Sequence, residues 1–248
     1  MRIITVENQS SLTPQEIQDI TVALSEQALS DFNTSPWVEH GYVSPIHVIS
    51  LLGAPPAGSW NLIFLNNLPG AGEGALGYHE DINGTKIPVS YIGVKECRED
   101  GVAISEVASH ELVEMAVDPY VNGNEAKFVS YAGKNYILEI ADPVQNCGYT
   151  IAGQTVADFV WPRFFRMAQT RLAYSQRQSV MAPLTLAPDG YMSIRTPGQE
   201  WHQIFGEKRA SLPKFSERLS RAGVPEVIKY RNQTTIGDAI KTARSAIS

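Results

Sequence analysis

A run of ten residues, Ser109 to Asp118, constrains the fold and the chemistry of this chain more than any other segment. On an α-helix, His110 and Glu114 lie four residues apart, so both side chains project from one face and can contact one metal ion. Glu111 lies about 100° further round a helix of about 3.6 residues per turn, within reach of a water molecule that the ion holds. The Asp118-Pro119 pair then ends the helix. The segment therefore predicts a helix that begins near residue 105 and carries two metal ligands and a general base.

The spacing of these residues matches that of the HExxH zinc helix, with Glu114 in the place of the second histidine. A site with one histidine and two carboxylates is more anionic than a site with two histidines and one carboxylate. Its metal is therefore a weaker Lewis acid, and the water molecule on that metal is less acidic. Such donors also accept harder ions than zinc, including manganese and calcium. The sequence predicts zinc or another divalent metal as the cofactor.

A catalytic zinc site requires a third protein ligand, and three carboxylates after the motif are candidates for it. Asp118 follows His110 by eight residues, which keeps it near the same face, although an Asp-Pro pair is also a common helix exit. Glu139 and Asp142 close an otherwise apolar strand, where one carboxylate can bind the metal while the other orients the ligand histidine. The alternative for both is a pair of solvated turn residues. The predicted metal ligands are His110, Glu114, Glu139 and Asp142, with Asp118 as the other candidate for the third position.

His79 follows a glycine-rich loop, residues 68–77, and precedes a strand predicted over 87–94. Pro88 suits that strand to the edge of a sheet, because proline lacks the N–H that an inner position needs. In zinc peptidases the edge strand beside the metal helix binds the substrate backbone, and a nearby histidine can stabilise the oxyanion. His79 is therefore a candidate catalytic residue beside Glu111, with a surface-loop histidine as the alternative. The remaining histidines lack a partner at a suitable spacing and are interpreted as structural or solvated: His40, His47 and His202.

The rest of the chain predicts a mixture of strands and helices. A capping box at Thr13 to Glu16, with proline at the first helical position, starts a helix that runs to Phe32. Hairpins are expected within 128–140 and 149–156, and the aromatic segment 158–165 is expected to pack over the site or the core. This order of elements predicts an α+β fold with a mixed sheet and a metal-site helix. Runs typical of strands occupy 1–7, 43–52, 60–65, 87–94, 191–195 and 201–205, and short helices are expected at 215–222 and 236–246.

The composition is that of a folded protein without a membrane span. The 248 residues are 43% hydrophobic and 19% charged, which fits one large domain or one domain with an appendage and argues against disorder. No apolar run approaches the roughly 18 residues of a membrane helix, and the first residues resemble a strand rather than a secretory signal. Cys97 and Cys147 are too few for a disulfide framework and are interpreted as ordinary thiols.

Charge is unevenly distributed along the chain. Residues 205–248 hold nine of the 20 basic residues and four of the 26 acidic ones, so this segment carries a formal charge of +5 and the remainder −11. A basic arm on an acidic body indicates contact with an acidic partner. Nucleic acid is one candidate, but no patch of interleaved aromatic and basic residues supports it. An acidic neighbouring protein subunit is at least as good a candidate.

Three short motifs resemble a loose group of bacterial and phage-associated proteins. They are SHELVEMAVDPY at 109–120, LEIADP at 138–143 and VADFVWP at 156–162. The first two also resemble part of the pattern of plant exordium-type and actinobacterial secreted proteins. Many of these proteins are described as zincin-like metallopeptidases. The resemblance covers roughly residues 1–165 and implies a zincin-like α+β fold, with His110 and Glu114 as metal ligands and Glu111 as the base.

Together these observations predict a zincin-like domain over 1–168, an irregular β-rich extension over 169–204 and a basic arm with short helices over 205–248. One interpretation is a metal-dependent, peptidase-like hydrolase acting on a protein or peptide, in which Glu111 deprotonates the attacking water. The other is a non-catalytic, zincin-like structural protein of a phage virion, which binds assembly partners through its arm. The intact Glu111 favours the first, whereas Glu114 and the charged arm favour the second. The expected location is the cytoplasm or a virion.

Overall fold

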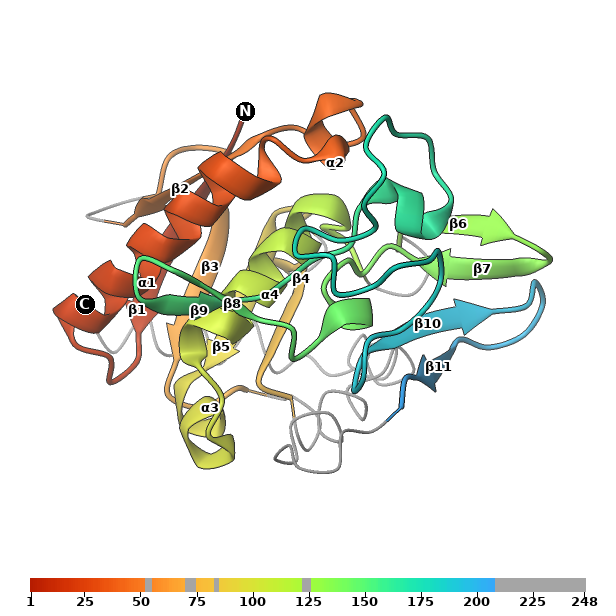
Figure 1. Cartoon of the computed structure of the whole chain (residues 1–248). Coiled ribbons are helices and arrows are strands. Elements are labelled where there is room, and N and C mark those ends of the chain that lie inside the picture. The colour runs from red at the N-terminus through yellow and green to blue at the C-terminus, as the bar shows by residue number, and fades with distance from the viewer. Residues whose placement is uncertain (52–54, 70–74, 83–84, 122–125, 208–248) are drawn as a thin grey trace.

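The structure, a computed structural model of the chain, describes residues 1–51, 55–69, 75–82, 85–121 and 126–207. Within these ranges, helices are combined with two separate sheets and a small two-stranded hairpin (Figure 1). This arrangement confirms the predicted α+β fold class. No helix in the described ranges is long and apolar enough to cross a membrane. The two short helices predicted at 215–222 and 236–246 lie outside the described residues.

The larger sheet has five strands in the order β2-β1-β3-β5-β4. β1, β2, β3 and β5 run parallel to one another, and β4 pairs antiparallel with β5. The sheet is therefore mixed, as predicted, with an antiparallel strand at one edge. The strands are β1 (Arg2–Gln9), β2 (Ile46–Ser50), β3 (Trp60–Leu65), β4 (Gly77–Asp81) and β5 (Pro88–Gly93).

The prediction of the edge strand is wrong. β5, which begins at Pro88, lies between β3 and β4, so β4 forms the edge instead. Proline is tolerated at the first residue of an inner strand, where one missing N–H disturbs little of the ladder. β4 has no counterpart among the predicted strands because its sequence, GYHED, lacks the apolar alternation of a half-buried strand. His79 therefore lies on the edge strand itself and not in a loop that precedes it.

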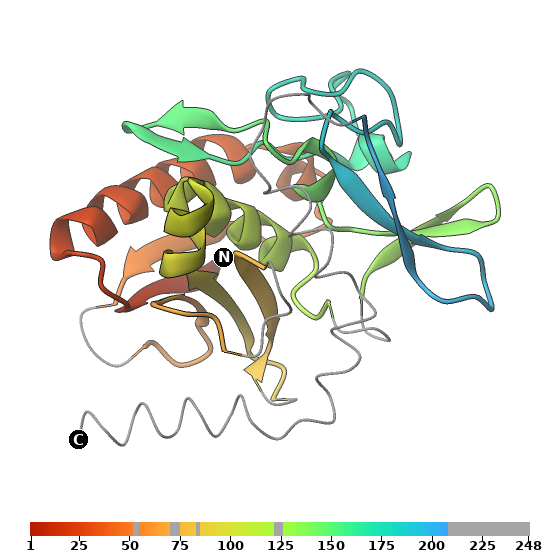
Figure 2. The ribbon, with the colours of Figure 1, turned by 90° about the horizontal axis from the view of Figure 1, so that it is seen from below.

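Two long helices, α1 (Pro14–Gln27) and α4 (Ile104–Val117), lie on one face of the larger sheet (Figure 2). α1 begins at the predicted capping box: the Thr13 hydroxyl accepts the Glu16 N–H at 3.2 Å, and the Glu16 carboxylate accepts the Thr13 N–H at 2.7 Å. The helix continues as a π-helix over Ala28–Phe32, so its predicted start and length are confirmed. The shorter helices are α2 (Pro36–Glu39) and α3 (Val94–Asp100).

The motif helix α4 is enclosed by the rest of the fold. It ends at Asp118, as predicted, and every residue from Val107 to Val117 is buried. It packs against the sheet through β4 and β5, and also against α1 and the hairpin of β8 (Tyr149–Ile151) and β9 (Gln154–Val156). The ionisable side chains of the motif therefore lie in the interior, where burial without a partner is costly.

The second sheet has four antiparallel strands in the order β11-β10-β7-β6. The hairpin of β6 and β7 turns at Ala132-Gly133, and both turn residues have positive φ, 49° and 76°. A two-residue turn with this backbone follows the natural twist of a hairpin, and the pairing of β6 with β7 confirms the hairpin predicted within 128–140. The strands are β6 (Phe128–Tyr131), β7 (Lys134–Ile137), β10 (Tyr191–Arg195) and β11 (His202–Phe205).

Residues of the extension predicted over 169–204 share this sheet and the main core. β10 pairs with β7, and Ala187 and Met192 belong to the same apolar cluster as residues of α1 and α4. The aromatic segment 158–165 packs into that cluster too, through residues that include Phe159 and Phe164. The second sheet therefore lies directly against the region that carries the motif helix. Cys97 and Cys147 form no disulfide.

Candidate metal centre

Three ionisable side chains converge at the motif helix. His110 Nε2 lies 3.1 Å from Glu114 Oε2 and 3.1 Å from Asp142 Oδ1, and all three side chains are buried. His110 and Glu114 are one turn apart on α4, and Asp142 begins a short 3-10 helix (Asp142–Val144) beyond β7. Ligand atoms placed about 2.0–2.2 Å from a tetrahedral ion are about 3.3 Å apart, so the observed separations fit a shared cation.

The Glu114 carboxylate is oriented by the backbone that carries Asp142. Its Oε1 accepts the N–H groups of Ala141 and Asp142 at 3.0 and 3.1 Å, which leaves Oε2 facing His110. Burial raises the pKa of Glu114, but the charge of His110 and the hydrogen bond to it lower that pKa to about 2. Glu114 is therefore ionised at neutral pH. Hydrogen bonds of this kind hold a metal-binding carboxylate in place.

His110 and Asp142 retain a proton between them. Burial and the charge of Glu114 raise the pKa of Asp142 to about 7, although His110 opposes this change. Burial lowers the pKa of His110, but Glu114 and Asp142 together raise it well above its usual value. A divalent cation at the point where the three groups converge would replace this proton and stabilise both carboxylates in their charged form. The chemistry of the donors therefore fits a metal ion.

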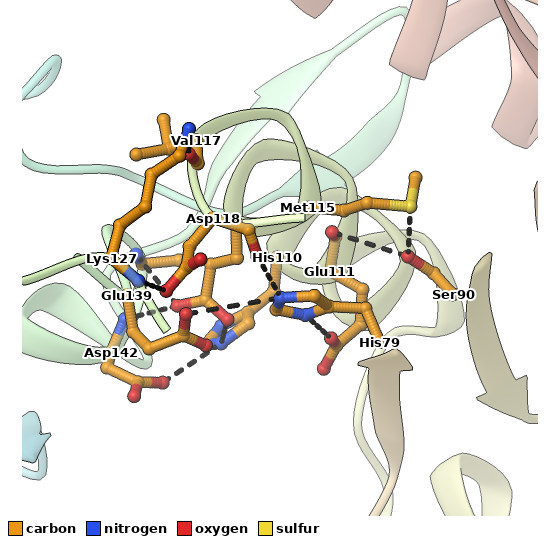
Figure 3. Close-up of polar contacts among 12 residues, drawn as sticks. His79, Ser90, His110, Glu111, Met115, Val117, Asp118, Lys127, Glu139 and Asp142 are labelled. Carbon is orange, nitrogen blue, oxygen red and sulfur yellow. Dashed lines mark hydrogen bonds and ion pairs between the residues drawn. The ribbon is translucent and has the colours of Figure 1, made fainter. Parts of the chain in front are cut away.

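His79 makes a second contact between the edge strand and the motif helix. Its Nδ1 lies 3.1 Å from Glu111 Oε2, and its Nε2 lies 2.9 Å from the backbone oxygen of Asp118 (Figure 3). A carbonyl oxygen can only accept a hydrogen bond, so Nε2 carries a proton. The contact between Nδ1 and Glu111 requires another proton, held on the imidazole or on the carboxylate. Burial lowers the pKa of His79, but the hydrogen bond and the charge of Glu111 raise it overall.

The close approach of β4 to α4 depends on Gly77. A Cβ atom at this position would lie 2.9 Å from Val107 Cγ1 and 3.0 Å from Glu111 Cγ, so a larger residue would push the strand away from the helix. Side chains two residues apart in a strand share a face, so His79 points to the same side as Gly77. The missing side chain at Gly77 therefore lets His79 reach Glu111.

Glu139 lies beside the converging atoms but not among them. Its Oε1 is 4.0 Å from His79 Nε2, is buried, and has no hydrogen-bond partner within the described part of the chain. Burial and the charges of Glu114, Asp118 and Asp142 raise the pKa of Glu139 well above its usual value. The protonated form of Glu139 is therefore favoured. The geometry therefore favours Asp142 over Glu139 as the third ligand, with Glu139 as a neighbour that adds negative charge.

Asp118, the other candidate for the third ligand, closes the helix. It is the C-terminal cap of α4, and its Oδ2 accepts the backbone N–H of Lys127 at 2.8 Å. The Lys127 ammonium in turn donates to the backbone oxygen of Val117 at 2.7 Å. These contacts join the end of α4 to the segment that leads into β6. The geometry favours the role of helix exit for Asp118.

The motif helix makes further polar contacts that the sequence hardly predicts. The Ser109 hydroxyl donates to Gln27 Oε1 at 2.7 Å and accepts the Ala157 N–H at 2.9 Å, which joins α4 to α1 and to the VADFVWP motif. Tyr191, on β10, is buried beside the segment of Asp142, and burial together with the charges of Asp142 and Glu114 raises the pKa of its hydroxyl well above the usual value. Ser109 directly precedes His110 in the sequence, but no spacing relates Gln27 or Tyr191 to the motif. These two positions depend on long-range packing alone.

In the described ranges, two groups of three side chains have ligand atoms within 4.8 Å of one another: His110 with Glu114 and Asp142, and His79 with Glu111 and Glu114. In the second group, both nitrogens of His79 are already engaged in hydrogen bonds, with Glu111 and with the Asp118 backbone oxygen. The first group is therefore the better candidate for a metal centre. The other three histidines belong to neither group: His40, His47 and His202.

The cluster as a whole holds more acidic than basic groups. Two histidines and Lys127 face five carboxylates, which are Glu111, Glu114, Asp118, Glu139 and Asp142. Added positive charge would stabilise this set, which again fits a cation. Comparisons of the chain with protein-family models, with curated proteins and with solved structures found no match. Function is therefore inferred from these contacts.

Proposed function

We propose that this protein is a metal-dependent hydrolase whose cofactor, zinc or another divalent ion, is held by His110, Glu114 and Asp142. The observation that carries the proposal is the convergence of three buried ligand atoms, with 3.1 Å from His110 Nε2 to each carboxylate. Three protein ligands leave one position of a tetrahedral ion open, as in catalytic zinc sites. Four protein ligands would instead indicate a purely structural site.

Glu111 is the proposed general base. It follows the ligand His110 directly on α4, and His79 Nδ1 contacts its Oε2 at 3.1 Å. When bound, the metal supplies a Lewis acid that polarises a substrate carbonyl and makes water more acidic. Glu111 accepts the proton of the attacking water on its carboxylate. Because both nitrogens of His79 are engaged, we assign this residue to the orientation of Glu111 and not to direct contact with an oxyanion.

The proposed substrate is a peptide or protein, as a zincin-like fold implies. The larger sheet supports this assignment, because β4 lies antiparallel at its edge and contacts α4. An extended peptide can add to such an edge through backbone hydrogen bonds. A peptide bound there would lie beside His79 and close to Glu111.

Metal analysis of the purified full chain tests the metal centre. We expect one zinc or manganese ion per chain after incubation with either metal, and loss of that ion in Glu114→Ala and Asp142→Ala. A chain that holds no stoichiometric metal after both incubations would refute the proposal. Glu106, on the same helix but in neither ligand group, provides the matched control: Glu106→Gln should bind as the wild type does.

Cleavage of unfolded casein by the metal-loaded chain tests the chemistry. Glu111→Gln should retain the metal and lose the hydrolysis that the wild type shows, whereas Glu106→Gln should retain both. The two readouts separate binding from catalysis, because Glu111 is not one of the proposed ligands. Equal cleavage by wild type and Glu111→Gln would show that Glu111 is not the base.

One observation favours a second candidate function, a non-catalytic protein with a structural metal. His110, Glu111 and Glu114 are only 6%, 5% and 2% exposed, and an enclosed site suits a structural ion. In this proposal the metal stabilises a phage virion protein that binds assembly partners through its basic arm. Removal of residues 208–248, which leaves β11 intact, should then abolish incorporation into an oligomer or particle. Unchanged incorporation would contradict it.

A further inference from the structure

We propose that the outer edge of β6 (127–131, the β6 edge) is a docking site for an extended, acidic segment of a partner protein, which adds to the second sheet as a further strand. β6 is the last strand in the order β11-β10-β7-β6 and lies at the outside of that sheet (Figure 1). An extended segment can bind such an edge through its backbone, while pockets beside the edge select its side chains. None of the proposed metal ligands lies on β6, so this site is independent of the proposed hydrolysis.

The backbone of β6 has hydrogen-bonding groups that its own hairpin does not use. The Leu138 N–H donates to the Lys127 oxygen at 2.9 Å, and the pairs of an antiparallel ladder alternate between bonded and non-bonded. Phe128 and Ser130 therefore belong to non-bonded pairs, and their N–H and C=O groups point away from β7. In the described part of the chain, neither residue bonds to the backbone of another segment. These groups are available to an added strand.

One face of the β6 edge carries an apolar hollow between two cations. Side chains two residues apart in a strand share a face, so Lys127, Val129 and Tyr131 point to the same side. Lys127 and Val129 line a hollow of about 390 Å³, and the Arg166 guanidinium lies 4.2 Å from the centre of the Tyr131 ring. The order along the strand is thus cation, hollow, cation. The other walls of the hollow are mostly apolar and include Trp37, Tyr42, Val117, Leu138 and Met167.

The exposed side chains here are of the kinds found at protein interfaces. Phe128, Tyr131 and Tyr42 are 43%, 41% and 37% exposed, and Arg166 is exposed beside them. Aromatic residues and arginine are enriched at such interfaces relative to the rest of a protein surface. The composition of the β6 edge therefore suits a protein partner.

The charges of the β6 edge indicate which partner fits. Arg166 makes no ion pair within the described residues, and the Lys127 ammonium uses one of its three N–H groups on the Val117 oxygen. Two copies of this chain joined at β6 would bring the same cations together. The segment 205–248 holds nine basic and four acidic residues, a formal charge of +5, so it is repelled as well. An acidic segment of another protein is complementary to both cations.

The spacing of the edge also sets the spacing of the partner's side chains. In an extended segment, side chains two residues apart lie on one face. A large apolar side chain over the hollow therefore shares its face with the residues two positions before it and two positions after it. Acidic residues at these two positions meet Lys127 and Arg166. The expected pattern is acid, any residue, large apolar residue, any residue, acid.

The test is the binding of a fluorescein-labelled peptide, Glu-Thr-Phe-Thr-Glu, to the full chain in the presence of a metal chelator. Fluorescence anisotropy measures the dissociation constant. We expect saturable binding with a constant below about 1 mM, weakened by added salt because the contacting charges are exposed. Glu-Thr-Ala-Thr-Glu should bind at least about 10-fold more weakly, because it lacks the apolar anchor. Absent binding, or equal binding of Lys-Thr-Phe-Thr-Lys, would overturn the proposal. The chelator keeps this result separate from any failure of the metal centre.

Ser130→Pro tests the backbone contact. Proline removes the N–H that points outward and keeps the bonds to β7, and edge strands tolerate it at such positions. It should raise the dissociation constant about 2- to 10-fold, the contribution of one hydrogen bond. Ser130→Ala is the matched control: it keeps the N–H, loses only the hydroxyl contact with Asn135, and should bind as the wild type does. Circular dichroism checks that both variants fold. Equal binding by folded Ser130→Pro and Ser130→Ala would overturn the proposed strand addition.

Arg166→Gln tests the charge, with Arg177→Gln as the matched control. Both arginines are exposed and stack on a tyrosine, but Arg177 lies over Tyr149 of β8, at 4.8 Å. Arg166→Gln should raise the dissociation constant about two- to fivefold and reduce its dependence on salt, whereas Arg177→Gln should change neither. Equal effects of the two variants would overturn the assignment. Sedimentation of the chain alone gives the last outcome: a dimer that Ser130→Pro dissociates would show that a second copy occupies the edge, which also overturns it.

Discussion

The two histidines of the cluster are equally enclosed, yet their surroundings differ in kind. His110 directs one nitrogen, Nε2, at two carboxylate oxygens, each 3.1 Å away. His79 uses both nitrogens, and each makes one hydrogen bond: Nδ1 with Glu111 and Nε2 with the Asp118 backbone oxygen. One N–H cannot serve two acceptors equally well, but one cation can. The first arrangement therefore supports the proposed metal centre, and the second suits a hydrogen-bonded support.

The difference follows from where the partners originate. His110 and Glu114 share a face of α4, and Asp142 meets them from the short 3-10 helix after β7, so three side chains from two elements converge. His79 arrives from the side on β4 and contacts the helix at two separate points along its length. Side chains that converge on one point can hold one ion. A side chain that contacts a helix at two points, as His79 does, instead holds its strand in a fixed position against that helix. Mutations at the two histidines should therefore have different effects.

The largest expected effect is on metal content. His110→Ala removes the atom on which the ligands converge and should lower zinc affinity by more than about 100-fold, since even outer partners contribute about 10- to 100-fold. His79→Ala should keep the stoichiometric metal, because none of the three proposed ligands is lost. Elemental analysis of both variants after dialysis measures this difference. Equal loss of metal in the two variants would show that both histidines belong to one metal site.

The next effect is on catalysis. Glu111→Gln should lower the rate of hydrolysis about 10²- to 10⁴-fold, the usual contribution of a general base. His79→Ala should reduce the same rate by a smaller factor, because Glu111 remains but loses the contact that orients it. Rates at saturating substrate, measured with metal content matched between variants, test this order. A larger loss in His79→Ala than in Glu111→Gln would assign a direct catalytic role to His79.

The third effect concerns pH and metal removal. Burial and Glu114 raise the pKa of Asp142 from 3.8 to about 7, so the folded state binds this proton more tightly than the unfolded chain does. The bound proton therefore stabilises the folded state at low pH, and this stabilisation is lost as the pH rises through about 7. The loss amounts to at most about 4 kcal/mol, because each unit of pKa corresponds to about 1.4 kcal/mol. The raised pKa of His110 acts in the same direction. Glu114, with its pKa near 2, contributes a constant amount across this range.

Urea unfolding of the chelator-treated protein at a series of pH values measures this loss. The free energy of unfolding should decrease from about pH 5 to about pH 8. With saturating zinc the decrease should disappear, because metal binding favours the deprotonated ligands. If the free energy of unfolding of the metal-free protein instead increases over this pH range, the expected direction of the pH dependence is wrong.

The smallest expected effect is at Gly77. An added Cβ would collide with Val107 and Glu111, and such overpacking typically costs about 1–3 kcal/mol. Gly77→Ala should therefore reduce the free energy of unfolding and separate His79 from Glu111, while zinc affinity stays near the wild-type value. Denaturant unfolding and metal titration of the same samples provide both readouts. A strong loss of zinc affinity would show that β4 supports the metal centre directly.

Several elements were predictable because their signals are local. The capping box at Thr13 and Glu16, the positive-φ turn at Ala132-Gly133 and the helix end at Asp118 each depend on residues within a few positions. The same holds for His110 and Glu114, whose shared face follows from the period of the helix. β4 and its place at the edge were not predictable, because a short polar strand leaves no periodic signal and strand order depends on distant pairings.

The sequence by itself determined which residues could act at the motif helix, because the period of the α-helix sets which side chains share a face. Only the tertiary structure placed Asp142, rather than Asp118 or Glu139, against His110 Nε2 and gave His79 its two hydrogen-bond partners. These contacts join residues that lie tens of positions apart in the chain. They depend on the packing of whole elements against one another, for which neither local propensity nor motif spacing carries information.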